Sequence, residues 1–155
     1  SFYTYKITNY TELINAINDL KLNTTDDILI QEFIAWEEYS VPVINWNILP
    51  IMKLEKSENE LFDYTSKYED NSRIKEIFPK LENSLQDKLS IDTKKIYNFF
   101  NLKWISRIDF LVKDWWIYFL EVNTIPWLNE VSILPQVWKL TWKSYEELIK
   151  EIINV

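Results

Sequence analysis

The chain has 155 residues, 47% of them apolar, and a formal net charge of −7. The length fits a single domain, and the apolar content is sufficient for a hydrophobic core. The negative charge argues against a nucleic-acid-binding surface and against attraction to an anionic membrane. The sequence contains neither cysteine nor histidine, which excludes thiol catalysis and leaves carboxylates, Lys, Arg, Tyr, a metal or the backbone for any chemistry. Because we find no leader peptide and no long apolar span, we expect a cytoplasmic protein.

The sequence of the N-terminal part predicts one helix, with one strand before it and one strand after it. Alternating apolar residues favour a strand over residues 1–7. Apolar residues at helical spacing predict a helix over residues 11–20, capped by Asn9 or Thr11. Residues 28–34 are mostly apolar, which predicts a second strand.

Two further strands are expected over residues 38–44 and 47–54, joined by a turn at Asn45-Trp46. Pro42 and Pro50 indicate edge or irregular positions, because proline cannot donate to a strand ladder. Residues 55–72 are charged and lack clean periodicity. Such a segment is typical of either a functional lid or a disordered region.

Three helices are predicted in the C-terminal half. The longest spans residues 81–100, either as one helix or as two divided at Ser90-Ile91-Asp92, and a short one spans residues 133–139. The last helix begins at Ser144, with Glu147 three positions later as a capping box. The apolar face of the longest helix contains Leu85, Leu89, Ile96, Phe99 and Phe100.

Between the long helix and the short one, two alternating segments predict a β-hairpin over residues 105–112 and 117–121. We place its loop at residues 114–116. In this register one face of the hairpin is polar and the other is apolar, and a slip of one residue would break the separation. The apolar face is expected to contain Ile108, Phe110, Val112, Tyr118, Leu120 and Val122.

The polar face of this hairpin brings four chemically active side chains together. Asp109 lies opposite Glu121, and Arg107 lies opposite Asn123. Two opposed carboxylates repel unless a cation lies between them, and Mg²⁺ prefers a few carboxylate or carbonyl oxygens together with phosphate and water. Arg107 is then left to bind a phosphate or an oxyanion. For residues 121–127 alone, the alternative is a solvated strand end followed by a turn.

These residues resemble a known family. The segments 107–109 and 121–126, which read Arg-Ile-Asp and Glu-Val-Asn-Thr-Ile-Pro, followed by Ser132, are similar to the C-terminal part of D-alanine–D-alanine ligases, which are ATP-grasp enzymes. The resemblance implies an α+β fold, the ATP-grasp C-terminal domain, in which helices cover an antiparallel sheet. It covers residues 1–155 as a partial domain, so we expect an N-terminal domain and the start of the central domain outside them. Three further blocks agree in order: 28–34 with 37–41, 62–68 and 144–149.

The resemblance implies an ATP-dependent ligation of two D-alanines for peptidoglycan precursor synthesis. ATP phosphorylates the carboxylate of one D-alanine, and the amine of the second attacks the resulting acyl phosphate. Asp109, Glu121 and Asn123 would hold two Mg²⁺ ions, with Mn²⁺ as a substitute, to neutralise charge on the transferring phosphoryl group. Arg107 and the backbone N–H of Trp127, which is glycine in the family, would stabilise the oxyanion.

The resemblance also assigns residues to the nucleotide and to the second amino acid. Without it, the nucleotide segment is an apolar strand followed by exposed acids, and the loop positions are a solvated lysine beside a packing tyrosine. The expected nucleotide-binding residues are the adenine hinge Gln31, Glu32, Phe33 and Ile34, the ribose acid Glu38 and the phosphate-binding Lys67. The expected substrate-binding residues are Tyr68 and Ser132.

Two other functions remain open. One is another ATP-grasp carboxylate–amine ligase that uses a different amino acid, and the other is a non-catalytic nucleotide-binding relic. For the ligase we expect D-alanine substrates, no nucleic-acid or membrane partner, and a homodimer of the full-length protein. The 155 residues alone are expected to make no dipeptide, because the domain that binds the first D-alanine lies outside them.

The chain departs from the family in one systematic way. It has no glycine and eight tryptophans, whereas average usage of about 7% would give roughly eleven glycines. Tryptophan occurs where turns or the resemblance require glycine, as in Asn45-Trp46, Asp114-Trp115-Trp116 and Pro126-Trp127. Trp138 and Trp142 flank the short helix, where glycine caps are usual. We hypothesise that the tryptophans are glycines in the organism, through a genetic code that reads UGA as glycine. The alternative is a truly glycine-free, tryptophan-rich chain.

Overall fold

The computed structural model describes residues 3–34, 36–55 and 75–153. The chain forms two compact units, one of residues 1–35 and 56–75 and the other of residues 36–55 and 76–155. Within the described ranges, no helix is long and apolar enough to cross a membrane.

The first unit contains helix α1, Tyr10–Asn23, which confirms the predicted helix. Asn9 is its N-cap, because the Asn9 side-chain oxygen accepts a hydrogen bond from the Glu12 N–H at 3.0 Å. The Glu12 carboxylate in turn accepts from the Thr8 N–H at 2.7 Å and from the Thr8 hydroxyl at 2.9 Å. These bonds from Thr8 lower the pKa of Glu12. The alternative cap, Thr11, is therefore wrong.

The two strands predicted in this unit are also wrong. Residues 4–8 and 28–34 have no regular secondary structure. In the second segment, Leu29 and Ile30 are 82% and 64% exposed. An apolar run becomes a strand only when its backbone groups pair with a neighbouring strand, and the run itself does not supply that partner.

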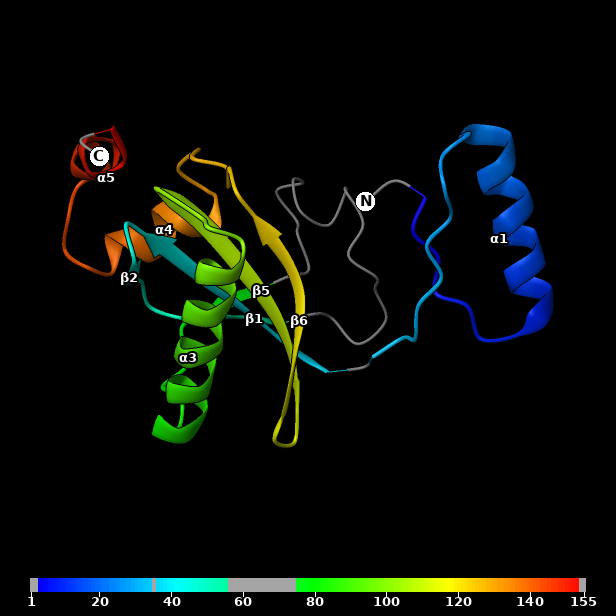
Figure 1. The fold of residues 1–155 in the computed structure, drawn as a ribbon, viewed down its shortest axis with the longest axis horizontal. Coiled ribbons are helices and arrows are strands. Elements are labelled where there is room, and N and C mark those ends of the chain that lie inside the picture. The colour runs from blue at the N-terminus through cyan, green and yellow to red at the C-terminus, as the bar shows by residue number, and fades with distance from the viewer. Residues whose placement is uncertain (1–2, 35, 56–74, 154–155) are drawn as a thin grey trace. The chain divides into compact units, whose positions relative to one another are not determined.

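The second unit is built on an antiparallel sheet, as expected (Figure 1). Among the described residues the sheet has six strands in the order β4-β3-β1-β5-β6, with β2 paired to β1. Strand β1 is antiparallel to β2, β3 and β5, and β5 is antiparallel to β6. The strands are β1 Glu37–Ile44, β2 Asn47–Ile48, β3 Met52–Glu55, β4 Lys75–Ile77, β5 Ile105–Lys113 and β6 Trp116–Asn123.

The turn between β1 and β2 confirms the predicted tight hairpin. Asn45 and Trp46 have φ of 46° and 70°, the left-handed values that a type I′ turn requires at both central positions. The strand predicted over residues 47–54 is divided into β2 and β3. The division falls around Pro50, because proline has no N–H for the ladder.

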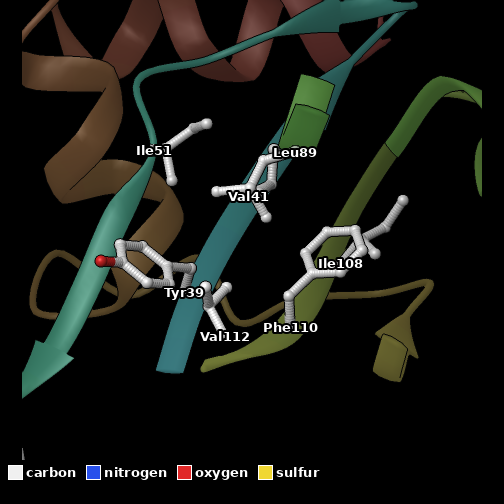
Figure 2. Close-up of a cluster of buried hydrophobic side chains, with 7 residues drawn as sticks. All are labelled: Tyr39, Val41, Ile51, Leu89, Ile108, Phe110 and Val112. Carbon is white, nitrogen blue, oxygen red and sulfur yellow. The ribbon is translucent and has the colours of Figure 1, made fainter. Parts of the chain in front are cut away.

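Helix α3, Asn83–Phe99, lies against one face of the sheet and confirms the helix predicted for residues 81–100. It is continuous, so the alternative of a break at Ser90-Ile91-Asp92 is wrong. Phe99, predicted to pack on the sheet, is 83% exposed. It follows the buried Tyr97 by two positions, which turns its side chain about 200° around the helix. Phe100 lies beyond the last helical residue and is also exposed. The core cluster joins β1, β5 and α3, as Figure 2 shows: Tyr39, Val41, Ile51, Leu89, Ile108, Phe110 and Val112.

Helices α4, Ile133–Lys139, and α5, Tyr145–Ile153, follow the sheet as predicted. Ser144 and Glu147 form the predicted capping box. The Ser144 N–H donates to the Glu147 carboxylate at 2.7 Å, and the Glu147 N–H donates to the Ser144 hydroxyl at 3.2 Å. Trp138, predicted to flank α4, instead lies inside it and is 4% exposed. Its indole N–H donates to the Ser144 carbonyl at 2.9 Å and so ties α4 to the start of α5.

The β5–β6 hairpin has the predicted register at its polar end. Asp109 pairs with Glu121, and Arg107 pairs with Asn123. The four side chains therefore lie on one face of the sheet, as the sequence pattern indicated.

The other end of the hairpin differs from the prediction. The turn is the two residues Asp114-Trp115 rather than three. Phe110 pairs with Phe119, so Leu120 is an extra residue in a β-bulge that offsets the shorter turn. Because of the bulge, the side chains between the turn and Leu120 lie on the opposite faces from those predicted. Phe119 lies on the face that α3 covers, and Tyr118, which was predicted on that face, lies on the polar face.

Candidate functional site

Five polar residues meet on the face of the sheet opposite α3, and we call them the polar cluster. Strand side chains alternate between the two faces. Because Val41 and Ile108 point into the core under α3, the residues next to them point the other way. Across β1 and β5, Ser40 pairs directly with Asp109. The polar cluster consists of Ser40, Arg107, Asp109, Glu121 and Asn123.

Asp109 is the centre of the polar cluster and is only 2% exposed. Its Oδ1 accepts hydrogen bonds from the Ser40 hydroxyl and from Arg107 Nε at 3.0 Å. Its Oδ2 accepts from Arg107 Nη2 at 2.8 Å and from Asn123 Nδ2 at 3.2 Å. A buried carboxylate is costly unless it is paired and hydrogen-bonded, and these three partners meet that requirement.

Arg107 is the cation of the polar cluster. Its Nη2 lies 3.8 Å from Glu121 Oε1, in addition to its contacts with Asp109. Burial by itself lowers the pKa of Arg107, but the hydrogen bonds and charge of Asp109, with the charges of Glu121 and Glu38, raise it overall. Glu38, the predicted ribose acid, is buried in β1 two positions before Ser40 and so lies on the same face.

Glu121 is the member of the polar cluster that faces solvent. Its side chain is 55% exposed, and its Oε1 accepts a hydrogen bond from Asn123 Nδ2 at 3.2 Å. The same amide nitrogen donates to Asp109. The two carboxylates and the amide thus converge at one point that opens to solvent through Glu121.

The two carboxylates and the carboxamide that meet here fit a divalent metal ion that also binds a phosphate group. Among the described residues, no group of three or more His, Cys, Asp or Glu side chains could hold a metal ion. The set here is two carboxylates and one carboxamide, and Mg²⁺ usually takes one or two carboxylates and completes its shell with phosphate and water. The oxygen and nitrogen of an amide exchange places by a simple flip, so Asn123 can turn its oxygen toward an ion.

Ser40 is the member of the polar cluster that the sequence analysis missed. It is separated from Asp109 by 69 positions in the chain, and nothing local connects the two residues. The signal that was available is a small polar residue inside an otherwise apolar run, at the alternation position that Glu38 also occupies.

The remaining predicted site residues lie outside the polar cluster. Gln31 to Ile34 belong to the first unit and are mostly exposed, with Lys6 Nζ 4.2 Å from the ring centre of Phe33. Ser132 is the N-cap residue of α4, and its hydroxyl donates to Asn129 at 2.6 Å. Trp127 is in the segment between β6 and α4 and is 54% exposed. Lys67 and Tyr68 lie outside the described residues.

A separate cavity of about 250 Å³ adjoins α5. It contains none of the predicted site residues, and its lining carries charges of both signs. The lining residues are Asn45, Trp138, Lys143, Glu147, Lys150 and Glu151.

The sheet, its covering helix and the polar cluster define the class of this protein as an α+β domain of the ATP-grasp type, which confirms the expected fold. A crystal structure of the D-alanine–D-alanine ligase from Bacillus anthracis matches with a TM-score of 0.81 and 26% identity, over 96% of this chain and 48% of that one. A structure of the Bacillus anthracis enzyme complexed with ATP has the same fold, with a TM-score of 0.80 and 22% identity over 96% of this chain and 47% of that one.

The chain belongs to the D-alanine–D-alanine ligase C-terminal family. The model described as "D-ala D-ala ligase C-terminus" matches residues 1–154. The D-alanine–D-alanine ligase of Legionella pneumophila (strain Corby) is 32% identical over 97% of this chain and 44% of its own length. Those of Fervidobacterium nodosum and Flavobacterium johnsoniae are 36% and 35% identical, over 92% and 100% of this chain and 46% and 48% of their own lengths. The chain thus spans less than half the length of these curated relatives.

Proposed function

We propose that the chain is part of an ATP- and Mg²⁺-dependent ligase that joins two D-alanines through an acyl phosphate. The observation that carries this proposal is the convergence of Asp109, Glu121 and Asn123 around Arg107 in a member of this family. The chemistry needs an oxygen-rich site for a metal–phosphate complex, with a fixed cation beside it.

Four of the five residues of the polar cluster have a task that their geometry supports. Asp109, Glu121 and Asn123 would hold the metal, which supplies charge neutralisation for the phosphoryl group when it is bound. Arg107 uses Nε and Nη2 toward Asp109, which leaves other N–H groups of its five for a developing oxyanion. Because Asp109 clamps the guanidinium, Arg107 is fixed before the reaction begins and needs no reorganisation.

Further assignments in this proposal rest on the family resemblance. They include a cytoplasmic location, a homodimer of the full-length protein, and Mn²⁺ as a substitute for Mg²⁺. The nucleotide would be held by the backbone of Gln31 to Ile34 at adenine, Glu38 at ribose and Lys67 at phosphate. The second amino acid would contact Tyr68 and Ser132, and the N–H of residue 127 would assist Arg107.

The test is product formation by the full-length protein with ATP, Mg²⁺ and D-alanine, followed by mass spectrometry of the product. We expect D-alanyl-D-alanine and one phosphate released per dipeptide. A panel of other D-amino acids identifies a ligase of different specificity if one of them reacts faster than D-alanine. Metal-dependent ATP binding, without phosphate release in the presence of any amino acid of the panel, would instead support the nucleotide-binding relic.

A further inference from the structure

The hydroxyl of Ser40 has no role in the proposed chemistry so far, although it is one of the most constrained polar groups in the second unit. Ser40 is 0% exposed and donates to Oδ1 of Asp109. The contact is fixed by the backbone, because the two residues are directly paired across β1 and β5. A directly opposed pair of this kind is rigid compared with a contact made by long side chains.

The two oxygens of Asp109 are used differently. Oδ1 is held by Ser40 and by Arg107 Nε, whereas Oδ2 is the oxygen that meets Asn123 at 3.2 Å. Without the Ser40 hydroxyl, Oδ1 would keep only its bond from Arg107 Nε. The carboxylate would still be held at Oδ2 by Arg107 Nη2 at 2.8 Å and by Asn123, but its rotation about the Cβ–Cγ bond would be less restricted. We propose that Ser40 is a positioning residue that directs Oδ2 of Asp109 toward the metal and nucleotide. This inference rests on the function proposed above.

The test compares three variants of the full-length protein in their binding of Mn²⁺ together with a non-hydrolysable ATP analogue, followed by electron paramagnetic resonance. Ser40→Ala removes the hydroxyl, and Ser40→Thr retains it. Ser106→Ala is the matched control, because Ser106 is also 0% exposed and its buried hydroxyl has no hydrogen-bond partner among the residues that the structure describes. It lies on the neighbouring strand β5 and points toward the opposite face.

We expect Ser40→Ala to weaken Mn²⁺ binding at least about tenfold, as loss of a hydrogen bond to a charged group does. Ser40→Thr and Ser106→Ala should bind within about twofold of the wild type. Equal binding by Ser40→Ala and the wild type would overturn the positioning role while leaving the proposed function intact. If the wild type binds Mn²⁺ and nucleotide but makes no dipeptide, the proposed function fails and the Ser40 comparison still decides. If the wild type binds neither Mn²⁺ nor the nucleotide analogue, the proposed function and the positioning role are both wrong.

A second, independent inference concerns the tryptophans. Trp46, Trp104 and Trp142 have φ of 70°, 57° and 61°. The left-handed region favours glycine, and bulky residues are rare there. Of the other described residues with positive φ, Asn45, Asn101 and Asp114 are of the types that tolerate it, whereas Tyr3, with φ of 62°, is a bulky exception.

The exposed fractions of the tryptophan side chains also separate positions that fit glycine from a position that fits tryptophan. Six tryptophans are more than half exposed, whereas tryptophan is highly buried on average. Trp138 is the contrast, since it is buried inside α4 and its indole N–H bonds to the Ser144 carbonyl. Glycine at this position would remove that bond and place a poor helix former inside α4. The six exposed residues are Trp46, Trp104, Trp115, Trp116, Trp127 and Trp142.

The left-handed backbone at three positions and the high exposure at all six point to glycine there, and we infer that position 138 alone among these seven is a true tryptophan. The hypothesis that all eight tryptophans are recoded is thereby narrowed at one position: the exposed six would come from UGA codons and Trp138 from UGG. Trp36, which is half-buried, stays under the original hypothesis. The test is peptide mass spectrometry of the protein isolated from its source cells, together with the codons of its gene. Glycine at the six positions and tryptophan at 138 is the expected result. Tryptophan at any of the three left-handed positions, or glycine at 138, overturns the assignment.

Discussion

Asp109 and Arg107 form a buried ion pair, in which each residue depends on the other. The Arg107 and Asp109 side chains are 16% and 3% exposed, and Nη2 lies 2.8 Å from Oδ2. Burying two charges costs solvation, and the pair recovers that cost only while both partners are present. The arrangement therefore contributes orientation to the site more than net stability to the fold.

The first prediction separates these two contributions. Arg107→Met should lower the free energy of unfolding by about 3–5 kcal/mol, because Asp109 remains buried without its cation. The double variant Arg107→Met with Asp109→Leu should recover most of that loss in urea unfolding, but should release no phosphate. A double variant as unstable as the single one would show that the polar cluster stabilises the fold in itself.

The second prediction concerns the backbone at position 142. Trp142 is 97% exposed with φ of 61°, so removing its side chain costs little, and only the Cβ matters. Trp142→Gly should be more stable than Trp142→Ala by about 1 kcal/mol, because alanine keeps the Cβ that crowds a left-handed residue. Thermal unfolding measures the difference. At Trp115, which does not have a positive φ, the glycine variant should show no such advantage over alanine, and an equal advantage there would contradict the explanation.

At the level of elements, the C-terminal helix depends on its capping box. Hydrogen bonds from the Ser144 N–H and hydroxyl lower the pKa of Glu147 below its ordinary value of 4.5. A carboxylate with a lowered pKa in the folded state stabilises the protein above its unfolded pKa. That contribution is lost as the pH falls through the folded-state pKa.

The third prediction follows from the direction of this pKa shift. Glu147→Gln should lower the unfolding midpoint relative to the wild type at pH 7, and the difference should shrink as the pH falls below about 4.5, the ordinary value. Glu146→Gln is the control, because it removes a carboxylate of the same helical turn. In the described part of the chain this carboxylate forms an ion pair with Lys150 at 2.6 Å and is not part of the capping box. A Glu147→Gln difference that stays constant from pH 7 to acid would contradict the capping role.

The fourth prediction concerns the bulge in β6. Leu120 is the extra residue between the pairs Asp109 with Glu121 and Phe110 with Phe119. Deleting Leu120 should leave both pairs in place and preserve phosphate release within about threefold, because the polar end keeps its register. Deleting Val122 should abolish the release, because it moves Asn123 to the face of the α3 core. Loss of activity in both deletions to the same extent would show that the bulge itself is required.

Several elements could be predicted from the sequence because their signals are local. The caps at Asn9 and Ser144 and the helical periodicity of α3 each involve residues within a few positions of one another. The pairing of Asp109 with Glu121 was also accessible, because this register places the polar side chains of the two strands on one face and the apolar side chains on the other. The shorter turn and the bulge cancel each other, so the correct pairing did not depend on the correct loop.

The parts that could not be predicted depend on partners distant in sequence. Residues 28–34 are apolar enough for a strand but have no regular secondary structure. Ser40 joins the polar cluster only because β1 and β5 are neighbours in the sheet. Trp138 looked like one more misplaced tryptophan until its burial and its bond to Ser144 were known.

At the level of the whole molecule, the chain carries the residues that we propose for metal and oxyanion binding within less than half the length of its curated relatives. The polar cluster lies entirely within the second unit, and each member comes from β1, β5 or β6. Its geometry is therefore set by one sheet, and any further substrate contacts add to it rather than create it.

The most direct test of the central claim is phosphate release from ATP by the full-length protein with D-alanine, compared between Glu121→Gln and Glu146→Gln. Both substitutions remove one exposed carboxylate, at side-chain exposures of 55% and 77%, and only Glu121 belongs to the polar cluster. We predict that Glu121→Gln lowers the rate at least a hundredfold, because a neutral amide is a poor ligand for a metal that balances phosphate charge, and that Glu146→Gln keeps the wild-type rate. Equal rates for the two variants would contradict the assignment of the polar cluster as the metal–nucleotide site.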